Sequence, residues 1–169
     1  VLEAAGQGAR VVVTSSPNNP TGKGTPPDAI ERPLKAGLVV IVHEAYQEFA
    51  QGSVVPMVPD YPNLAVLRTL SKWAGLAGLR VGYGVMAPEL AGLLLRIKPP
   101  YSVSQAAEAA LLATFEDLDL LRERVDRLVL ERERMSGLLA KAPGVTPWPS
   151  DANFVLCQLP DGKGRAVYQ

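Results

Sequence analysis

The sequence predicts an α/β fold built on a mostly parallel sheet with helices on both faces. Two short apolar runs rich in valine, residues 10–14 and 38–42, are typical of strands that are buried on both faces of such a sheet. Between them, the prolines at 26–27 mark the start of a helix and Gly37 marks its end. The chain therefore opens as a strand, a helix and a second, parallel strand.

Further elements follow the first two strands. In order, they are strands at 63–69 and 80–86, a helix that Pro88 opens and that ends before Pro99, an alanine-rich helix at 102–115, and a long helix from Asp117 to about Lys141. Along the long helix, apolar residues recur at spacings of three, four and seven, while acidic and basic residues share the outer face. These charges indicate a solvated helix surface.

The last part of the chain breaks this pattern. Prolines and glycines between residues 143 and 149 interrupt the helical periodicity before an apolar run at 153–159, which is typical of a strand. We therefore predict two units. Residues 1–141 form part of a large domain that includes the long connecting helix, and residues 142–169 form the start of a small C-terminal domain.

Composition excludes several classes of function. With 169 residues, 47% of them hydrophobic and 20% charged, the chain is expected to form an ordinary globular protein. Its formal net charge is zero and no basic stripe stands out, so neither nucleic acid nor a membrane surface is an expected partner. No apolar run is long enough to span a bilayer, and the first residues lack a basic region followed by an apolar stretch. We therefore expect a cytoplasmic protein.

The cysteine content limits the disulfides and metal sites that the chain can form. Cys157 is the single cysteine and lies within an apolar run, which is typical of a packed side chain. A single cysteine excludes an internal disulfide and any site with several cysteine ligands. We predict no metal-binding residues.

Unusual polar residues follow three of the predicted strands. Asn19 follows the first strand, His43 and Tyr46 follow the second, and Ser71 and Lys72 follow the third. Each alone has an ordinary explanation, since Asn-Asn-Pro-Thr-Gly is a turn sequence and a lysine after a strand is usually a solvated surface group. In open α/β sheets, however, ligands bind beyond the carboxyl ends of the strands, where these residues would converge.

The segment TLSKWAGLAGLR, residues 69–80, points to one kind of ligand. An amine such as that of Lys72 condenses with an aldehyde. The hydroxyls of Thr69 and Ser71, together with the guanidinium of Arg80, can hold a phosphate dianion beside it. The segment therefore suits a phosphorylated aldehyde cofactor.

Three segments together carry a family resemblance. In this order and spacing, SPNNPTG at 16–22, HEAY at 43–46 and the lysine segment at 69–80 resemble the fold-type I pyridoxal-phosphate aminotransferases, and most closely the histidinol-phosphate aminotransferases. The resemblance covers nearly the whole chain. It implies that the large unit is part of the family's domain for pyridoxal 5′-phosphate (PLP), and that the parent reaction exchanges the amino group of glutamate with imidazole-acetol phosphate.

The resemblance also implies roles for the residues. Lys72 matches the lysine that binds the cofactor aldehyde and later acts as a general base. Asn19 and Tyr46 match the two groups that hydrogen-bond the cofactor's ring hydroxyl, and such donors favour its ionised form. The two hydroxyls and the guanidinium of the lysine segment match the family's phosphate ligands. His43 would complete the set beside the pyridine ring.

His43 departs from the family pattern, in which an aspartate pairs with the protonated pyridine nitrogen. A histidine cannot supply a fixed negative charge, although a neutral imidazole can accept the ring N–H bond. Glu44 is not expected to substitute, because adjacent strand residues point to opposite faces. This change alone leaves PLP binding possible and weakens transamination. Because other groups of the family's site are also missing, we expect PLP to bind far more weakly than to an intact family member, or not at all. The alternative is that His43 is a packed core residue at a site without function.

The resemblance further implies that both ends of the family's domain are missing. The family's N-terminal phosphate loop, its ring-stacking aromatic and the arginine that binds the substrate carboxylate have no counterpart in the chain. Val1 would then enter in the middle of the fold, and apolar surface around residues 11–13 and 155–159 would need a cover. We therefore expect a homo-oligomer, most simply a dimer, since family active sites lie at a dimer interface.

Three functions remain open at this point. The first is a truncated enzyme of the histidinol-phosphate aminotransferase type that acts on a small amino-acid or phosphorylated substrate. The second is a non-catalytic remnant whose exposed surface drives oligomerisation. The third is an enzyme similar to the threonine-phosphate decarboxylases, which share the lysine segment and the turn motif.

Overall fold

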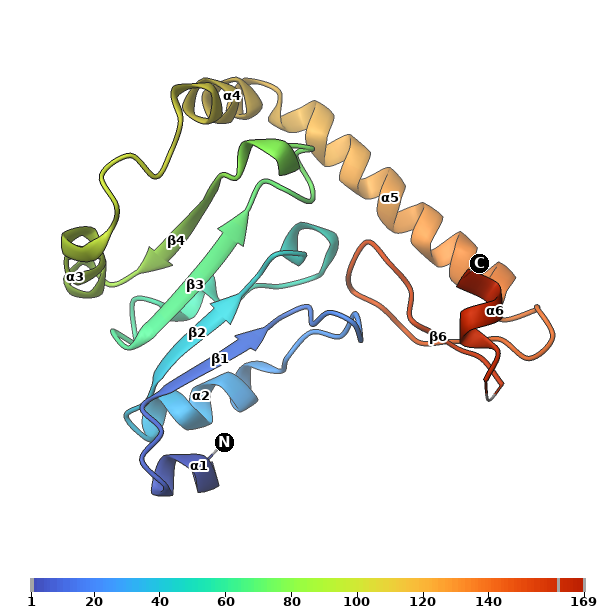
Figure 1. Cartoon of the computed structure of the whole chain (residues 1–169), viewed down its shortest axis with the longest axis horizontal. Coiled ribbons are helices and arrows are strands. Elements are labelled where there is room, and N and C mark those ends of the chain that lie inside the picture. The colour runs from blue at the N-terminus through green and yellow to red at the C-terminus, as the bar shows by residue number, and fades with distance from the viewer. Residues whose placement is uncertain (1, 161, 169) are drawn as a thin grey trace.

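A computed structural model describes residues 2–160 and 162–168 and shows an α/β arrangement around a four-stranded sheet (Figure 1). The strands, β1 (Val11–Ser15), β2 (Val39–His43), β3 (Leu64–Thr69) and β4 (Gly82–Met86), lie in the sheet in sequence order. The first three are mutually parallel, and β4 runs antiparallel to β3. The predicted α/β class with a mostly parallel sheet is confirmed. Val1 and Gln169 lie outside the described residues.

The helices are α1 (Leu2–Gly6), α2 (Pro27–Lys35), α3 (Pro88–Ile97), α4 (Gln105–Glu116), α5 (Leu118–Leu139) and α6 (Gly164–Tyr168), with short 3₁₀ turns η1 (Gln47–Phe49), η2 (Val55–Met57) and η3 (Ala77–Leu79). Helices α2, α3 and α5 begin within one residue of where the sequence predicts, whereas α1, before the first strand, was not predicted. The helix expected at 102–115 begins three residues later, because the hydroxyl of Ser104 accepts the N–H of Ala107 at 3.2 Å and caps it there. No helix in the described ranges is both long and apolar enough to cross a membrane.

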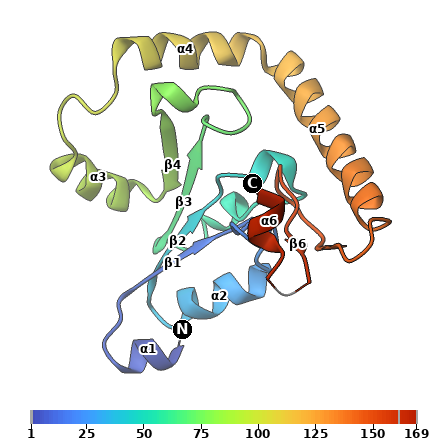
Figure 2. The same cartoon turned by 45° about the vertical axis from the view of Figure 1, so that its right-hand side comes forward.

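One face of the sheet forms the main core. Helix α2 lies against β1 and β2 there (Figures 1 and 2), and its inward side chains pack with those of the central strands, the buried set being Ile30, Leu34, Val40, Val42, Val54, Val58, Leu64 and Val66. The opposite face is open at β1, where Val11 and Val13 are 51% and 69% exposed. The prediction that the first strand is buried on both faces is therefore wrong for this chain, because no described element packs over that side. The expected exposed surface around residues 11–13 is present.

Helices α3, α4 and α5 form an arc outside the sheet. Figure 1 shows α5 running past the carboxyl ends of β1, β2 and β3 toward the C-terminal segment. There, Val125 of α5 packs with Tyr46, Phe49 and Ala152, so the helix closes the far side of the loops that follow the strands. This contact places the C-terminal segment beside the carboxyl end of the sheet.

The C-terminal segment holds a small second sheet, β5 (Thr146–Pro147) paired antiparallel with β6 (Cys157–Gln158). The strand expected at 153–159 is therefore shorter than predicted. The residues before it bend, since the N–H of Ala152 donates to the hydroxyl of Ser150 at 3.1 Å. The division at 141/142 stays a prediction, although α5 ends two residues earlier.

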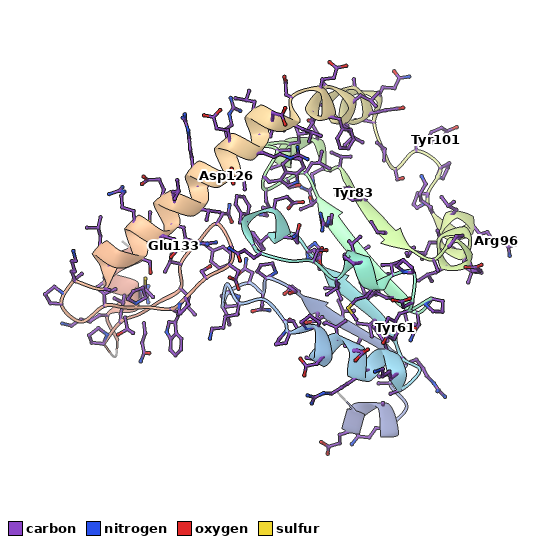
Figure 3. All side chains as sticks on the ribbon, turned by 180° about the vertical axis from the view of Figure 1, so that it is seen from behind. Tyr61, Tyr83, Arg96, Tyr101, Asp126 and Glu133 are labelled. Atoms are coloured by element: carbon purple, nitrogen blue, oxygen red, sulfur yellow. The ribbon has the colours of Figure 1, made fainter. Side chains whose placement is uncertain are left out.

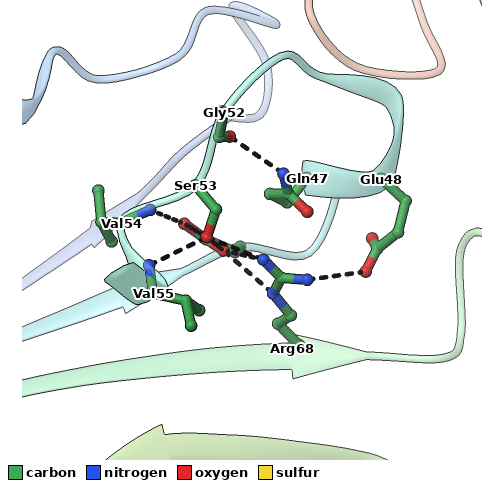
Figure 4. Close-up of polar contacts among 8 residues, drawn as sticks. Gln47, Glu48, Gly52, Ser53, Val54, Val55 and Arg68 are labelled. Atoms are coloured by element: carbon green, nitrogen blue, oxygen red, sulfur yellow. Dashed lines mark hydrogen bonds and ion pairs between the residues drawn. The ribbon is translucent and has the colours of Figure 1, made fainter. Parts of the chain in front are cut away.

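A buried ion pair anchors the loop that follows β2 (Figure 4). The carboxylate of Glu44, which is only 2% exposed, accepts hydrogen bonds from Arg68 Nη2 at 2.8 Å and Nε at 3.1 Å, and from the N–H of Val54 at 2.8 Å. The hydroxyl of Ser53 lies 2.8 and 3.0 Å from its two oxygens. Burial opposes the charge of Arg68, but the hydrogen bond and the charge of Glu44 outweigh it and raise the pKa of Arg68.

Glu48 joins this cluster less favourably. Its carboxylate lies 3.6 Å from Arg68 Nη1, and its Oε2 atom is buried without a hydrogen-bond partner among the described residues. Burial raises the pKa of Glu48, and the negative charge of Glu44 adds to the effect. The ionised form of Glu48 therefore costs folding free energy.

Replacing Arg68 by methionine should lower the free energy of unfolding by about 3 kcal/mol, because Glu44 would be left buried without its cation. The matched control is Arg127→Met, which breaks an ion pair with Glu123 whose side chains are 75% and 58% exposed. That change should cost at most about 0.5 kcal/mol. Urea unfolding of both variants measures the difference, and equal losses would contradict a structural role for the buried pair.

Glu48→Gln should alter how stability depends on pH. Since the folded-state pKa of Glu48 is raised, its contribution is fully present below the ordinary glutamate pKa and is lost as pH rises through the raised value. The glutamine variant lacks this loss, so its stability relative to the unchanged chain should be higher at pH 7 than at pH 4. Unfolding curves at the two pH values test this, and a difference independent of pH would refute it.

Candidate active site

A cavity of about 460 Å³ lies at the carboxyl ends of β1, β2 and β3. All seven residues that the sequence singles out line it, together with two that it missed. The lining residues are Ser15, Asn19, His43, Ala45, Tyr46, Thr69, Ser71, Lys72 and Arg80. Segments separated by tens of residues in the sequence therefore meet at one place.

The register of the sheet brings the strand ends together. Ser15 at the end of β1 pairs with His43 at the end of β2, and His43 pairs with Leu67 of β3. Because side chains alternate along a strand, His43 faces the cavity while Glu44 faces the core and its partner Arg68. The expectation that Glu44 and His43 point to opposite faces of the sheet is confirmed.

Two polar side chains lie together at one side of the cavity. The amide of Asn19 donates to the phenolic oxygen of Tyr46 at 3.1 Å. Tyr46 is held from behind by Phe154, whose ring meets it edge-on at 5.2 Å between centroids. The neighbouring Asn18 donates to the hydroxyl of Ser15 at 2.9 Å, which fixes the turn at the end of β1. Asn19 and Tyr46 thus present two adjacent polar groups to the same space.

Lys72 lies close to this pair. Its Nζ atom is 5.6 Å from the centroid of the Tyr46 ring, within the range of a cation–π contact. The loop that carries Lys72 closes on itself, since the N–H of Leu76 donates to the carbonyl of Leu70 at 3.2 Å. Gly75 in this loop has φ of +73°, a left-handed conformation that favours glycine.

Two hydroxyls and a guanidinium also line the cavity and contact one another. The hydroxyl of Thr69 donates to that of Ser71 at 2.9 Å and accepts the N–H of Ser71 at 3.1 Å. Nη1 of Arg80 lies 3.4 Å from the Ser71 hydroxyl and donates to the carbonyl of Ala77 at 2.9 Å. Arg80 has φ of +55°, which is uncommon for a residue other than glycine and turns the chain back toward Ser71. This cluster can accept an anion.

Sequence reasoning missed Ser15 and Ala45 as lining residues. A signal existed for Ser15, because it is the last residue of β1 and a polar residue at a strand's carboxyl end is where ligands bind. Ala45 carries no polar group, and its place follows only from its neighbours His43 and Tyr46.

The cavity therefore combines an amine, a pair of polar side chains and an anion-accepting cluster. A model of the aminotransferase class I and II family matches residues 1–169. The chain belongs to the class I and II aminotransferases. The predicted family resemblance is thereby confirmed.

Individual relatives agree with this family. The chain is 47% identical over 163 residues to the histidinol-phosphate aminotransferase of Roseiflexus castenholzii, covering 95% of this chain and 44% of that protein. The crystal structure of histidinol-phosphate aminotransferase from Sinorhizobium meliloti in complex with pyridoxal-5′-phosphate matches with a TM-score of 0.84 at 30% identity, over 98% of this chain and 47% of that one. A decarboxylase from Sulfurospirillum multivorans matches with a TM-score of 0.81 at 28% identity, over 95% and 49%. The chain thus spans less than half the length of each.

Proposed function

We propose that the cavity binds PLP through Lys72 and that the protein takes part in amino transfer of the histidinol-phosphate aminotransferase type, between glutamate and imidazole-acetol phosphate. The observation that carries this proposal is the convergence of Lys72, the Asn19–Tyr46 pair and the anion-accepting cluster on one cavity. The amine suits the cofactor aldehyde, the pair suits its ring hydroxyl and the cluster suits its phosphate. The PLP complex of the Sinorhizobium meliloti relative supports the same cofactor.

The residues divide the work between holding the cofactor and moving a proton. When bound, PLP supplies an electron sink for the electron pair of the substrate's α-carbon. Lys72 would hold the cofactor through its aldehyde carbon and, with its amine free, would take up and return the proton at the substrate's α-carbon. Asn19 and Tyr46 hold the ring oxygen, which sets the plane of the ring relative to Lys72.

Thr69, Ser71 and Arg80 hold the phosphate. Two hydroxyls and a backbone N–H can donate to its oxygens, and the guanidinium adds positive charge with a planar pair of donors. The existing bonds among these groups keep them oriented before a ligand arrives, which reduces the entropy lost on binding. His43 lines the same cavity, and a neutral imidazole there could accept the N–H of the pyridine ring.

Titration of PLP into the 169-residue chain tests the proposal. We expect a visible absorbance band with the unchanged chain and none with Lys72→Ala, because only a lysine amine at this position bonds to the aldehyde beside its phosphate and ring ligands. The matched control is Lys98→Ala, since Lys98 is an exposed lysine that contacts Pro99 and Ser102 away from the cavity. If Lys72→Ala kept the band and Lys98→Ala lost it, the site would be assigned to the wrong lysine.

Arg80→Met should weaken PLP binding about tenfold or more, because hydrogen bonds to a charged group contribute about 1.5–3 kcal/mol. Pyridoxal, which lacks the phosphate, serves as the control ligand. Its affinity should be the same for both forms of the chain. Equal loss of affinity for PLP and pyridoxal would mean that Arg80 supports the loop and does not bind the phosphate.

His43→Asp should speed the reaction of the PLP-loaded chain with glutamate, because a carboxylate beside the ring nitrogen stabilises the protonated ring and so strengthens the electron sink. His43→Asn is the matched control, since it is similar in size to aspartate and carries no charge. Stopped-flow absorbance after mixing with glutamate measures the rate. Identical rates for the aspartate and asparagine variants would show that His43 does not face the ring nitrogen.

A second candidate function is phosphothreonine decarboxylation. The structural match to a decarboxylase from Sulfurospirillum multivorans favours decarboxylation, and the resemblance of the lysine segment and turn motif to the threonine-phosphate decarboxylases suggests the substrate. The two reactions differ in their products. If the PLP-loaded chain is a decarboxylase, it should release carbon dioxide from O-phosphothreonine. If it is an aminotransferase, it should transfer the amino group of glutamate to the cofactor.

We also propose that the chain self-associates. Its open face carries exposed apolar side chains on β1, and α3 adds Leu93, Leu95 and Ile97, all more than half exposed. Arg96 in the last turn of α3 and Tyr101 after the helix lie at the edge of the molecule (Figure 3), and Tyr101 is 95% exposed. Apolar area of this extent favours a covering partner, and a second copy in a two-fold dimer is the simplest cover.

Sedimentation velocity should therefore show a species larger than the 18.0 kDa monomer. Leu95→Glu places a charge in the exposed apolar area and should shift the distribution toward the monomer. Asp119→Glu, on the fully exposed start of α5, is the control and should leave it unchanged. Association without any lysine-dependent uptake of PLP would favour the non-catalytic, oligomerising alternative. A monodisperse monomer at all concentrations would contradict self-association.

A further inference from the structure

The segment that follows α5 packs directly onto the turn that carries Asn19. At Gly22, which has φ of +71°, an added Cβ would clash with the hydroxyl of Ser150 and lie 2.8 Å from its Cβ. The N–H of Asp151 donates to the carbonyl of Gly22 at 2.7 Å, and the carboxylate of Asp151 accepts the N–H of Gly24 at 3.1 Å. The contact therefore leaves no space for a side chain and is fixed by hydrogen bonds in both directions.

The same segment is tied to the turn that follows Tyr46. Arg132 of α5, whose side chain is 11% exposed, uses Nη1 to donate to the carbonyl of Ala152 at 2.9 Å and to that of Phe49 at 3.2 Å. Phe49 ends η1, which begins directly after Tyr46. The ring of Phe154 then packs edge-on against Tyr46. Residues 150–154 thus contact both loops that carry the polar pair of the cavity.

The turn at 16–24 is attached to β2 at its start, where the N–H of Ser16 donates to the carbonyl of His43 at 3.1 Å, while Asp151 holds its tip. Its internal hydrogen bonds, from the N–H of Asn18 to Lys23 at 2.8 Å and from that of Gly22 to Asn18 at 2.7 Å, define its shape. They do not define where the tip lies relative to Tyr46. The bonds to Asp151 reach this tip from a segment 127 residues away in the sequence.

We propose that residues Ser150–Ala152 are a positioning clamp for the cofactor pocket, which sets the distance between Asn19 and Tyr46 by holding Gly22 and Gly24 on one side and Arg132 on the other. The clamp does not touch the cofactor. Its effect on cofactor binding rests on the proposed function, because Asn19 and Tyr46 must lie together to share the ring oxygen. Its effect on the Asn19–Tyr46 geometry does not depend on PLP.

The first test follows the side-chain amide of Asn19 in the chain without PLP. Selective ¹⁵N-asparagine labelling gives four side-chain signals, from Asn18, Asn19, Asn63 and Asn153. Asp151→Ala should shift the Asn19 signal, because Gly24 loses its acceptor, whereas Asp151→Asn keeps an acceptor oxygen and should restore the signal. Asn63, which donates to Leu34 and Leu38, is the internal reference. An unchanged Asn19 signal in Asp151→Ala would overturn the proposal.

The second test uses the close contact at Gly22. Gly22→Ala creates the clash with Ser150 and also incurs the cost of alanine at positive φ. Gly37→Ala is the matched control, since Gly37 has φ of +79° with no atom within 4 Å of the added Cβ. Gly22→Ala should shift Asn19 and Gly37→Ala should not. In the Gly22→Ala chain, adding Ser150→Gly removes the clashing atoms. The Asn19 signal should then return toward its original position. If it did not, the contact between residues 22 and 150 would not be the cause of the shift.

The last readout links the clamp to the cofactor. Asp151→Ala should weaken lysine-dependent PLP binding about fivefold, the effect of losing a hydrogen bond worth about 1 kcal/mol, and Asp151→Asn should bind as the unchanged chain does. The pH midpoint of the visible band should also rise in Asp151→Ala, because fewer donors stabilise the ionised ring oxygen. If the unchanged chain binds no PLP, the proposed function fails while the asparagine signals still decide the clamp. If Asn19 shifts and neither PLP readout changes, the clamp's role in the cofactor site is refuted.

Discussion

The buried ion pair between Glu44 and Arg68 is the interaction on which the rest of the site depends. Glu44 is the first residue after β2, and its carboxylate is held by Arg68 of β3 from within the core. Because strand side chains alternate, fixing Glu44 inward directs His43 outward to the cavity. The ion pair also fixes the start of the loop that follows β2, and this loop carries Tyr46 to the edge of the cavity. A buried charge thus sets the direction of neighbouring functional side chains.

The cavity itself is built from loops held by a rigid sheet. The strands end in register, so the short loops after them bring their polar residues to one edge. Two left-handed residues, Gly75 and Arg80, let the loop after β3 turn back on itself. That turn is what places the guanidinium of Arg80 near the hydroxyl of Ser71, in the cavity that Lys72 and Tyr46 also line.

Much of this arrangement could be predicted from the sequence, because local patterns determine it. Valine runs gave the parallel strands to within one or two residues, and prolines gave the starts of α2 and α3. The position of Lys72 beside Tyr46 follows from their places after neighbouring strands, once the strands are known to be parallel. Family resemblance then supplied the roles that local patterns do not specify.

The features that could not be predicted depend on partners distant in the sequence. The exposure of β1 reflects which elements pack over it, and the shortened strand at 153–159 reflects the bend after Ser150. No local sequence pattern predicts the contact between Gly22 and Ser150, since the two residues lie more than a hundred positions apart. From the sequence, Gly22 is an ordinary turn glycine. The structure shows in addition that a side chain at this position would clash with Ser150.

The central claim is that Lys72 is the residue to which PLP bonds in this chain. Reduction of the PLP-treated chain with borohydride, followed by peptide mass spectrometry, tests it directly, because reduction makes the link between a lysine and the cofactor permanent. The account predicts one phosphopyridoxyl group, on the peptide that contains Lys72, at PLP concentrations that leave the five other lysines unmodified. Modification spread over several lysines, or confined to one other than Lys72, would contradict it.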